Sequence, residues 1–165
     1  RVFAAWEGPA EGFVPDPRLP ALGGRRYGGD PGVNATEDDF QAHRLGLGVP
    51  DPAADAQADK TYPIEANFDL LNGIDFAKGC FVGQETTSRM KRRGTIRNRM
   101  LPIAFEGAPP PFGAEVLNGD LRAGEVLSGR DGMAMALLRL DRLEGALTAE
   151  GRTVRVRRPG WFPAV

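Results

Sequence analysis

The sequence contains one cysteine and one histidine in 165 residues. A single cysteine cannot form an internal disulfide, which suits a reducing compartment, so we expect a cytoplasmic protein. One cysteine and one histidine cannot supply the ligands of a closed zinc site, so no metal site is expected. The histidine, His43, lies in a predicted helix, and no third residue completes a Cys–His catalytic arrangement. We therefore interpret His43 as structural or as a surface residue.

The sequence also lacks a long apolar run and an excess of charge of one sign. No stretch approaches the roughly 20 apolar residues that span a membrane. The formal net charge of −1 gives no reason to expect general attraction to nucleic acid or to membranes. The start of the chain has no signal-peptide pattern. Arg1 leads directly into an apolar run, and we expect that an upstream part of the protein precedes it.

Glycine and proline are plentiful, with 22 and 14 residues, which predicts short elements joined by turns. Strands are expected at 1–6, 18–22 and 25–27. A helix is predicted to begin after Thr36, a good N-cap, and to end near Gly46. A second helix is predicted within 61–76, where Ile64, Phe68, Leu71 and Ile74 recur at helical spacing.

After Gly94 the sequence pattern changes to short apolar runs separated by turn signals. Asn118-Gly119 and Asp131-Gly132 are hairpin signals, and Glu150-Gly151 marks a further turn. Five or six strands in about seventy residues predict a small antiparallel barrel or sandwich. The predicted fold class is α+β, with the boundary placed near Gly94, so that the two parts are 1–94 and 95–165.

The segment KGCFVGQE, residues 78–85, contains the only cysteine between two glycines. Gly79 and Gly83 predict a sharp turn, followed by a helix from about Gln84 to Arg93. Cys80 precedes this helix start and lies two residues from Lys78, and both features favour a reactive thiolate. The alternative is that a lone cysteine is an inert buried residue.

The helix predicted after this segment has almost no apolar face and ends in basic residues. Arg89, Lys91, Arg92, Arg93, Arg97 and Arg99 form a cluster dense enough to bind an anion, such as a phosphate, a polyglutamate tail or RNA. A solvated helix end explains the same pattern. The sequence alone leaves both interpretations open.

The segment 78–85 resembles the K-G-C-[FY]-x-G-Q-E signature of the YgfZ family of folate-binding proteins, which is related to the glycine-cleavage T-protein, an aminomethyltransferase. PDPRLPALGGR, HRLGLGVP, YPIEANFDLLNGIDF and RPGWFP are similar to the corresponding parts of that family. The resemblance implies an incomplete T-protein-like α/β portion that binds folate, residues 1–94, followed by a β-barrel. It implies a role in assembling or repairing iron–sulfur clusters, including those of tRNA-modifying enzymes, with iron–sulfur client or scaffold proteins as partners.

The resemblance also implies a site for tetrahydrofolate. Cys80 and Lys78 are expected to carry the chemistry, Glu65 and Asn67 to hold the pterin ring, and the arginines to hold the glutamate tail. The remaining residues expected at the cofactor are Gly79, Phe81, Gly83, Gln84, Glu85, Arg89 and Arg93.

Two other functions remain open from the sequence. One is folate-dependent one-carbon transfer of the aminomethyltransferase type, although Gly46 stands where those relatives carry an acidic residue facing the pterin. The other is a module that docks RNA or an acidic protein through Arg89–Arg99. We expect a maturation factor rather than a turnover enzyme, without direct nucleic-acid binding and without a membrane partner.

Overall fold

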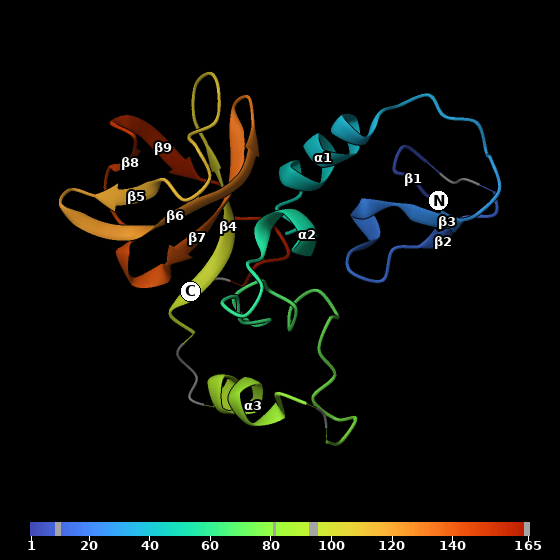
Figure 1. Cartoon of the computed structure of the whole chain (residues 1–165), viewed down its shortest axis with the longest axis horizontal. Coiled ribbons are helices and arrows are strands. Elements are labelled where there is room, and N and C mark those ends of the chain that lie inside the picture. Colours follow the sequence, from blue (N-terminus) through green and yellow to red (C-terminus); the bar gives the residue numbers. More distant parts are fainter. Residues whose placement is uncertain (9–10, 81, 93–95, 164–165) are drawn as a thin grey trace.

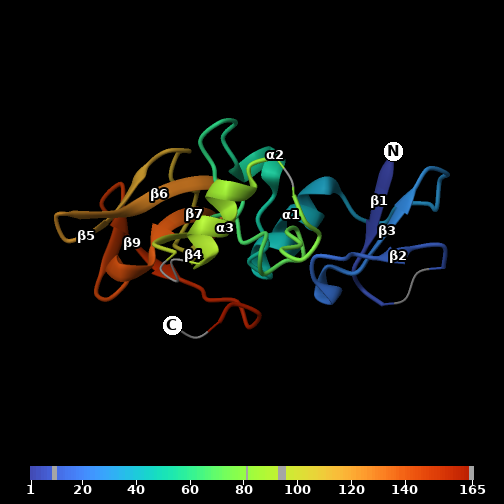
Figure 2. The same ribbon diagram turned by 90° about the horizontal axis from the view of Figure 1, so that it is seen from below.

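The computed structural model of the chain describes residues 1–8, 11–80, 82–92 and 96–163. A barrel lies at one end, a small sheet at the other, and helices lie between them (Figures 1 and 2). The strands are β1 (Val2–Ala5), β2 (Val14–Pro15), β3 (Gly24–Tyr27), β4 (Asn98–Ala104), β5 (Glu115–Asn118), β6 (Leu121–Arg130), β7 (Met133–Arg139), β8 (Leu147–Ala149) and β9 (Arg152–Val156). The helices are η1 (Pro20–Leu22), α1 (Glu37–Gly46), α2 (Pro52–Asp55), α3 (Gln84–Arg92) and η2 (Leu140–Arg142). Over these ranges, no helix has the length and apolar character needed to cross a membrane.

The N-terminal sheet has the order β1-β3-β2, and both pairings are antiparallel. The strands expected at 1–6 and 25–27 are confirmed. The strand expected at 18–22 is wrong, because Pro20 begins a short 3₁₀ helix, a position where its missing N–H costs nothing. The carboxylate of Asp16 holds this corner together, since it accepts hydrogen bonds from Arg18 at 2.9 Å and from Arg25 at 2.7 Å.

Helix α1 begins and ends as its sequence predicts. Thr36 and Asp39 form a capping box, in which the Thr36 hydroxyl accepts from the Asp39 N–H and the Asp39 carboxylate accepts from the Thr36 N–H. The helix ends at Gly46, and Gly48 follows with a φ of 72°. A Cβ at Gly48 would lie 2.3 Å from the Pro159 ring, so only glycine fits where α1 meets the C-terminal segment.

Residues 61–76 do not form the predicted helix. They form a series of turns in which Asn67 and Asn72 have φ values of 62° and 58°. Asparagine tolerates this left-handed conformation, which interrupts a helical ladder. The apolar spacing still predicted burial correctly, since Ile64 and Leu71 are almost fully buried. We call residues 62–73 the turn segment.

Six strands of the described chain close a barrel in the order β4-β7-β6-β5-β8-β9, with antiparallel neighbours. The β-hairpin turns expected at Asn118-Gly119 and Asp131-Gly132 and the turn expected at Glu150-Gly151 are confirmed, because they join β5 to β6, β6 to β7 and β8 to β9. β8 was missed, since three residues carry too little alternation to be recognised. The barrel prediction is therefore confirmed, whereas the T-protein-like arrangement of 1–94 and the boundary near Gly94 stay predictions.

The barrel wall is apolar on both faces along its first strand. Leu101 and Ile103 point into the barrel core, and Met100 packs outside it with Leu45 and Met135. This division follows the period-2 alternation of side chains along a strand. The outer face of β4 is thus covered by the end of α1 and by the turn segment.

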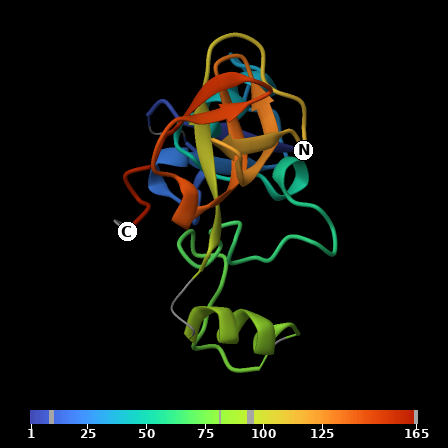
Figure 3. The ribbon, with the colours of Figure 1, turned by 90° about the vertical axis from the view of Figure 1, so that its left-hand side faces the viewer.

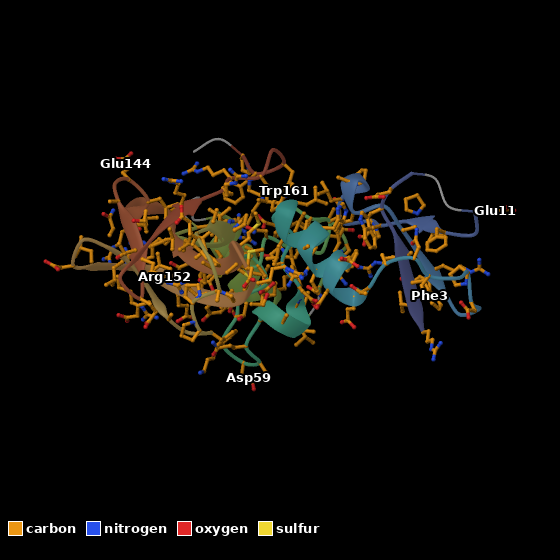
Figure 4. All side chains as sticks on the ribbon, turned by 90° about the horizontal axis from the view of Figure 1, so that it is seen from above. Phe3, Glu11, Asp59, Glu144, Arg152 and Trp161 are labelled. Carbon is orange, nitrogen blue, oxygen red and sulfur yellow. The ribbon has the colours of Figure 1, made fainter. Side chains whose placement is uncertain are left out.

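A buried polar cluster fixes the two central helices to the barrel. Arg44 of α1 donates to the Asp55 carboxylate at 3.0 Å and to the Ser128 hydroxyl of β6 at 3.0 Å. Asp55 also accepts from the Ser128 and Asp51 backbone N–H groups. Arg44 and Asp55 are both almost fully buried, so their charges depend on each other. In Figure 4, Trp161 lies beside α1, where its indole N–H donates to the Leu47 carbonyl at 2.8 Å.

Candidate functional site

The signature segment, residues 78–85, follows the turn segment and ends in the first turn of α3, and its residues 78–80, 82 and 83 lie outside the regular elements. Figures 1 and 3 show α3 standing apart from the barrel wall. Lys78, Gly79 and Cys80 are exposed, and Gly79 and Gly83 have φ values of 92° and 83°. Left-handed glycines on both sides of Cys80 produce the sharp turn that the sequence predicts. This turn presents the thiol to solvent.

The exposure of Cys80 decides between the two interpretations of its sequence. The thiol is free and exposed, so the inert buried cysteine is excluded. Lys78 is exposed as well, so both side chains can be reached from solvent.

A cavity of about 460 Å³ lies between the turn segment, the signature segment and α3. Its wall combines aromatic and aliphatic side chains with a carboxylate, an ammonium group and three hydroxyls. Cys80 lies in sequence between two of the lining residues, Lys78 and Val82. The lining residues are Tyr62, Pro63, Phe68, Gly73, Ile74, Asp75, Lys78, Val82, Gly83, Thr86 and Thr87.

Helix α3 begins at Gln84, as predicted, with Glu85 in its first turn and Arg89, Lys91 and Arg92 in its last. These placements complement the helix dipole. A hollow of about 490 Å³ follows one face of the helix. Its lining residues are Gln84, Glu85, Ser88, Arg89 and Arg92. The predicted helix end near Arg93 and the expected cofactor contacts of Phe81 and Arg93 lie outside the described residues.

The opposite side of α3 touches the body of the protein. Thr87 is buried, and the Lys91 ammonium lies 3.6 Å from the Asp69 carboxylate. The same ammonium lies 5.3 Å from the centre of the Phe76 ring, a cation–π distance. Thus α3 rests on the turn segment through one face and leaves its arginines in solvent.

The two residues expected to hold a pterin ring face the barrel. The Asn67 side chain is fully buried and donates to the Met100 carbonyl at 2.6 Å. The Glu65 carboxylate accepts from the Asn98 side chain at 2.9 Å, and its backbone N–H and carbonyl are also used, the latter by Met100. Both residues therefore tie the turn segment to β4, and neither lines the cavity.

Arg99 is also part of this tie, so it does not belong to an exposed anion site. Its guanidinium donates to both Asp69 oxygens, at 2.5 and 3.0 Å, and to the Ile64 carbonyl at 2.5 Å. The basic cluster predicted from the sequence is thus divided. Arg99 is buried, whereas Arg89, Arg92 and Arg97 are exposed.

The structure brings together only some of the expected site residues. Lys78 and Gly83 line the cavity, and Gln84, Glu85 and Arg89 line the hollow on α3. Sequence reasoning missed Tyr62 as a cavity residue and placed Phe68 only on a helix face. Tyr62 is the first residue of the turn segment and lies 16 residues before the signature, so no local signal connects it with the cavity.

A folate can be tested against these residues. The volume lies in the range of about 300–1,000 Å³ typical of small-molecule pockets, which are mostly apolar with a few polar groups. Tyr62 and Phe68 suit a flat ring, and Asp75 and Lys78 offer a carboxylate and a cation. The cavity fits such a ligand, whereas Glu65 and Asn67 do not, because their polar groups are committed to the barrel.

His43 has the structural role expected of it. Its Nε2 lies 3.0 Å from the Ala21 carbonyl oxygen, and its ring stacks on Trp6 at 5.4 Å between centres. Gly46, at the end of α1, is exposed and carries no carboxylate. Within the described ranges, no three or more His, Cys, Asp or Glu residues are grouped as metal ligands.

The C-terminal part of the chain is similar to one known barrel family. Residues 97–164 match the family described as "CAF17, C-terminal beta-barrel domain". This match begins one residue before β4 and includes every strand of the barrel.

Sequence similarity to individual proteins extends beyond the barrel. The chain is 41% identical over 117 residues to the "Iron-sulfur cluster assembly factor IBA57 homolog, mitochondrial" of Neurospora crassa, covering 62% of this chain and 26% of that protein. It is 31% identical over 169 residues to the mouse protein named "Iron-sulfur cluster assembly factor IBA57, mitochondrial", covering 92% and 47%. The human protein of the same name is 31% identical over 175 residues, covering 96% and 49%. The chain thus spans about a quarter to half the length of these relatives, which are consistent with the family indicated by the signature.

These relatives correct one prediction from the sequence. The scarcity of cysteine led us to expect the cytoplasm, but the relatives are named as mitochondrial proteins. The expectation was wrong because a low cysteine count reports only on redox conditions, and these do not distinguish compartments that keep thiols reduced.

Proposed function

We propose that this chain is part of an iron–sulfur cluster assembly factor in which Cys80 is the working thiol. The observation that carries the proposal is the exposed sulfur on a turn made by two left-handed glycines, beside a cavity. The names of its relatives support the same role. Exposure matters because a thiol must reach its target to act.

A single thiol limits how this chain can bind a cluster. A thiolate is a soft ligand suited to iron–sulfur clusters. Such clusters are usually held by four thiolates, and the sequence contains one cysteine. Cys80 therefore contacts a cluster together with ligands from an iron–sulfur client or scaffold protein. The cluster enzymes supported in this way include tRNA-modifying ones, as the signature resemblance implies.

Tetrahydrofolate is the small molecule proposed for the cavity. Tyr62 and Phe68 would flank its ring system, Asp75 would accept hydrogen bonds from ring nitrogens, and Lys78 would attract its anionic tail. A bound folate supplies a carrier for one-carbon groups. The residues of this chain bind it and exclude water from one of its faces.

The test compares Cys80→Ser with wild type in the full-length protein that includes its upstream part. In a strain lacking the protein, wild type should restore the activity of cluster enzymes and Cys80→Ser should not. Both should unfold at the same temperature, because an exposed side chain contributes little to stability. Both should bind tetrahydrofolate equally in a calorimetric titration, since the sulfur does not line the cavity.

The two readouts address separate parts of the proposal. Full rescue by Cys80→Ser would remove the thiol from the mechanism. Absence of heat on titration with tetrahydrofolate would remove the cofactor and leave the thiol role standing. Ser88→Ala, a similar small change on exposed α3, is the matched control for rescue.

A further inference from the structure

We propose that α3 is a movable wall of the cavity and that Lys91 is the positioning residue that holds this wall closed. The inference rests on the proposed function, in which the cavity takes a folate, and it names how that ligand enters and leaves. Lys91 itself does not line the cavity. Its role follows from the position of α3, from how little of the helix is buried, and from what its ammonium group contacts.

Helix α3 forms part of the cavity wall. Thr86 and Thr87 line the cavity from the helix, and much of the remaining lining comes from the turn segment and the two residues after it. In Figures 1 and 3, α3 stands apart from the barrel. The separation of the helix from the turn segment therefore determines how open the cavity is. The lining residues before the signature segment are Tyr62, Pro63, Phe68, Gly73, Ile74 and Asp75.

Little of α3 is buried against the rest of the protein. Thr87 is the buried residue among the nine of this helix, whereas α1 buries both Arg44 and Leu45. A helix of this length is marginal by itself and depends on packing for its stability. Because α3 has so little packing, one side-chain contact has a large influence on how tightly the helix lies against the turn segment.

Lys91 supplies such a contact, and it does so at a fixed point. Its ammonium group lies 3.6 Å from the Asp69 carboxylate and 5.3 Å from the centre of the Phe76 ring. The Asp69 side chain is fully buried and is held by Arg99 of β4 at 2.5 and 3.0 Å, so it stays with the barrel when the helix moves. Lys91 is 49% exposed and water competes for its ammonium group, so this contact breaks more easily than the buried pair.

The Lys91 contact acts on the face of the helix that lines the cavity. Thr87 and Lys91 are four residues apart, so they lie on the same face of α3. When Lys91 binds Asp69, this face is held against the turn segment and the cavity of about 460 Å³ is closed on that side. When Lys91 releases Asp69, the face can move outward and give a ligand access to the cavity. Closing elements of this kind commonly set the rates at which ligands enter and leave a site.

The contact should therefore affect rates rather than affinity. Lys91 can bind Asp69 both in the free protein and in the closed complex, so loss of the contact makes opening easier in both states. Association and dissociation of the ligand become faster by the same factor, and Kd stays unchanged. A residue that touched the ligand would instead change Kd, mainly through the dissociation rate.

The experiment measures the association and dissociation rates of tetrahydrofolate with the full-length protein by stopped-flow spectroscopy. Lys91→Met keeps the aliphatic part of the side chain and removes its charge, so both rates should rise about two- to fivefold, as expected for loss of a half-exposed ion pair. Lys91→Arg keeps the charge and the cation–π contact, so it should restore the wild-type rates.

Arg92→Met is the matched control for the loss of charge. Arg92 is exposed, is the next residue of α3, and has no carboxylate within 4.0 Å in the described part of the chain. Neither rate should rise in this variant.

A second measurement needs no ligand. Amide hydrogen exchange should be faster in α3 of Lys91→Met than in α3 of the wild type, and unchanged in the barrel strands. Rates and exchange that are equal in Lys91→Met and Arg92→Met would overturn the movable wall, as would a change in Kd with an unchanged association rate. If tetrahydrofolate does not bind the wild type, the proposed cofactor fails, and amide exchange alone then decides whether Lys91 holds α3.

Discussion

The barrel and the signature segment differ in how far their residues are buried. In the barrel, Leu101, Ile103 and Val126 are fully buried in one apolar core, and every strand pairs with neighbours on both sides. In the signature segment, Lys78, Gly79 and Cys80 are exposed outside regular structure. The comparison teaches that the barrel sequence encodes packing, whereas the signature sequence encodes a turn whose side chains are exposed to solvent.

The largest expected loss of stability comes from a substitution that breaks the attachment of the central helices to the barrel. Asp55→Ala leaves the buried guanidinium of Arg44 without its carboxylate, at 3.0 Å in the structure. Removing one partner of a buried ion pair typically costs about 3–5 kcal/mol. Urea unfolding should show this loss. Asp51→Ala, which removes a half-exposed carboxylate 4.0 Å from Arg44, is the control and should cost much less.

A smaller change in stability is expected when one apolar residue from each region is truncated to alanine. Leu101→Ala creates a cavity in the barrel core and should lower the free energy of unfolding by about 2–5 kcal/mol. Val82→Ala removes methyl groups that already lie in water, so it should change stability by no more than about 0.5 kcal/mol. Thermal unfolding of both variants measures the difference. Equal losses would show that Val82 is packed rather than presented.

The smallest expected effect is local and depends on pH. Burial alone would raise the pKa of Asp16, but hydrogen bonds and positive charge from Arg18 and Arg25 outweigh it and lower the pKa. The group therefore stabilises the fold above the unfolded pKa of about 3.9, and this contribution is lost as pH falls through the lower folded value.

The measurement uses a protein with Trp161→Phe, in which Trp6 is the remaining tryptophan. Trp6 follows β1 and stacks on His43, so its fluorescence reports on the N-terminal sheet and α1. Asp16→Asn should be less stable than the parent at pH 6, and the gap should close well below about pH 3.9. A gap that stays constant would mean that the carboxylate contributes through its shape and not its charge.

Much of the barrel could be predicted because its signals are local. Asn118-Gly119 and Asp131-Gly132 specify turns without help from distant residues, and alternation of side chains marks the strands on either side. The same holds for α1, whose start is set by Thr36 and Asp39, three residues apart. Where a structure depends on neighbours in sequence, the sequence suffices.

The turn segment could not be predicted, because its conformation is set by residues far along the chain. Its apolar spacing correctly indicated burial and wrongly indicated a helix. Asn67 takes a left-handed conformation and donates to Met100, 33 residues later, and Arg99 binds the Ile64 carbonyl from a similar distance. The contacts of Glu65 and Asn67 with β4 were missed for the same reason, since nothing local indicates that β4 would occupy their polar groups, and their role at a ligand stays a prediction.

One carboxylate determines how firmly α3 is held. Asp69 is fully occupied by the buried guanidinium of Arg99, and Lys91 reaches it only as a second, half-exposed partner at 3.6 Å. Dissolved ions screen the exposed contact and hardly affect the buried one. High ionic strength therefore weakens one contact of the helix that carries the arginines, while the turn segment stays anchored to the barrel. How firmly the helix beside the thiol is held thus depends in part on the salt concentration around it.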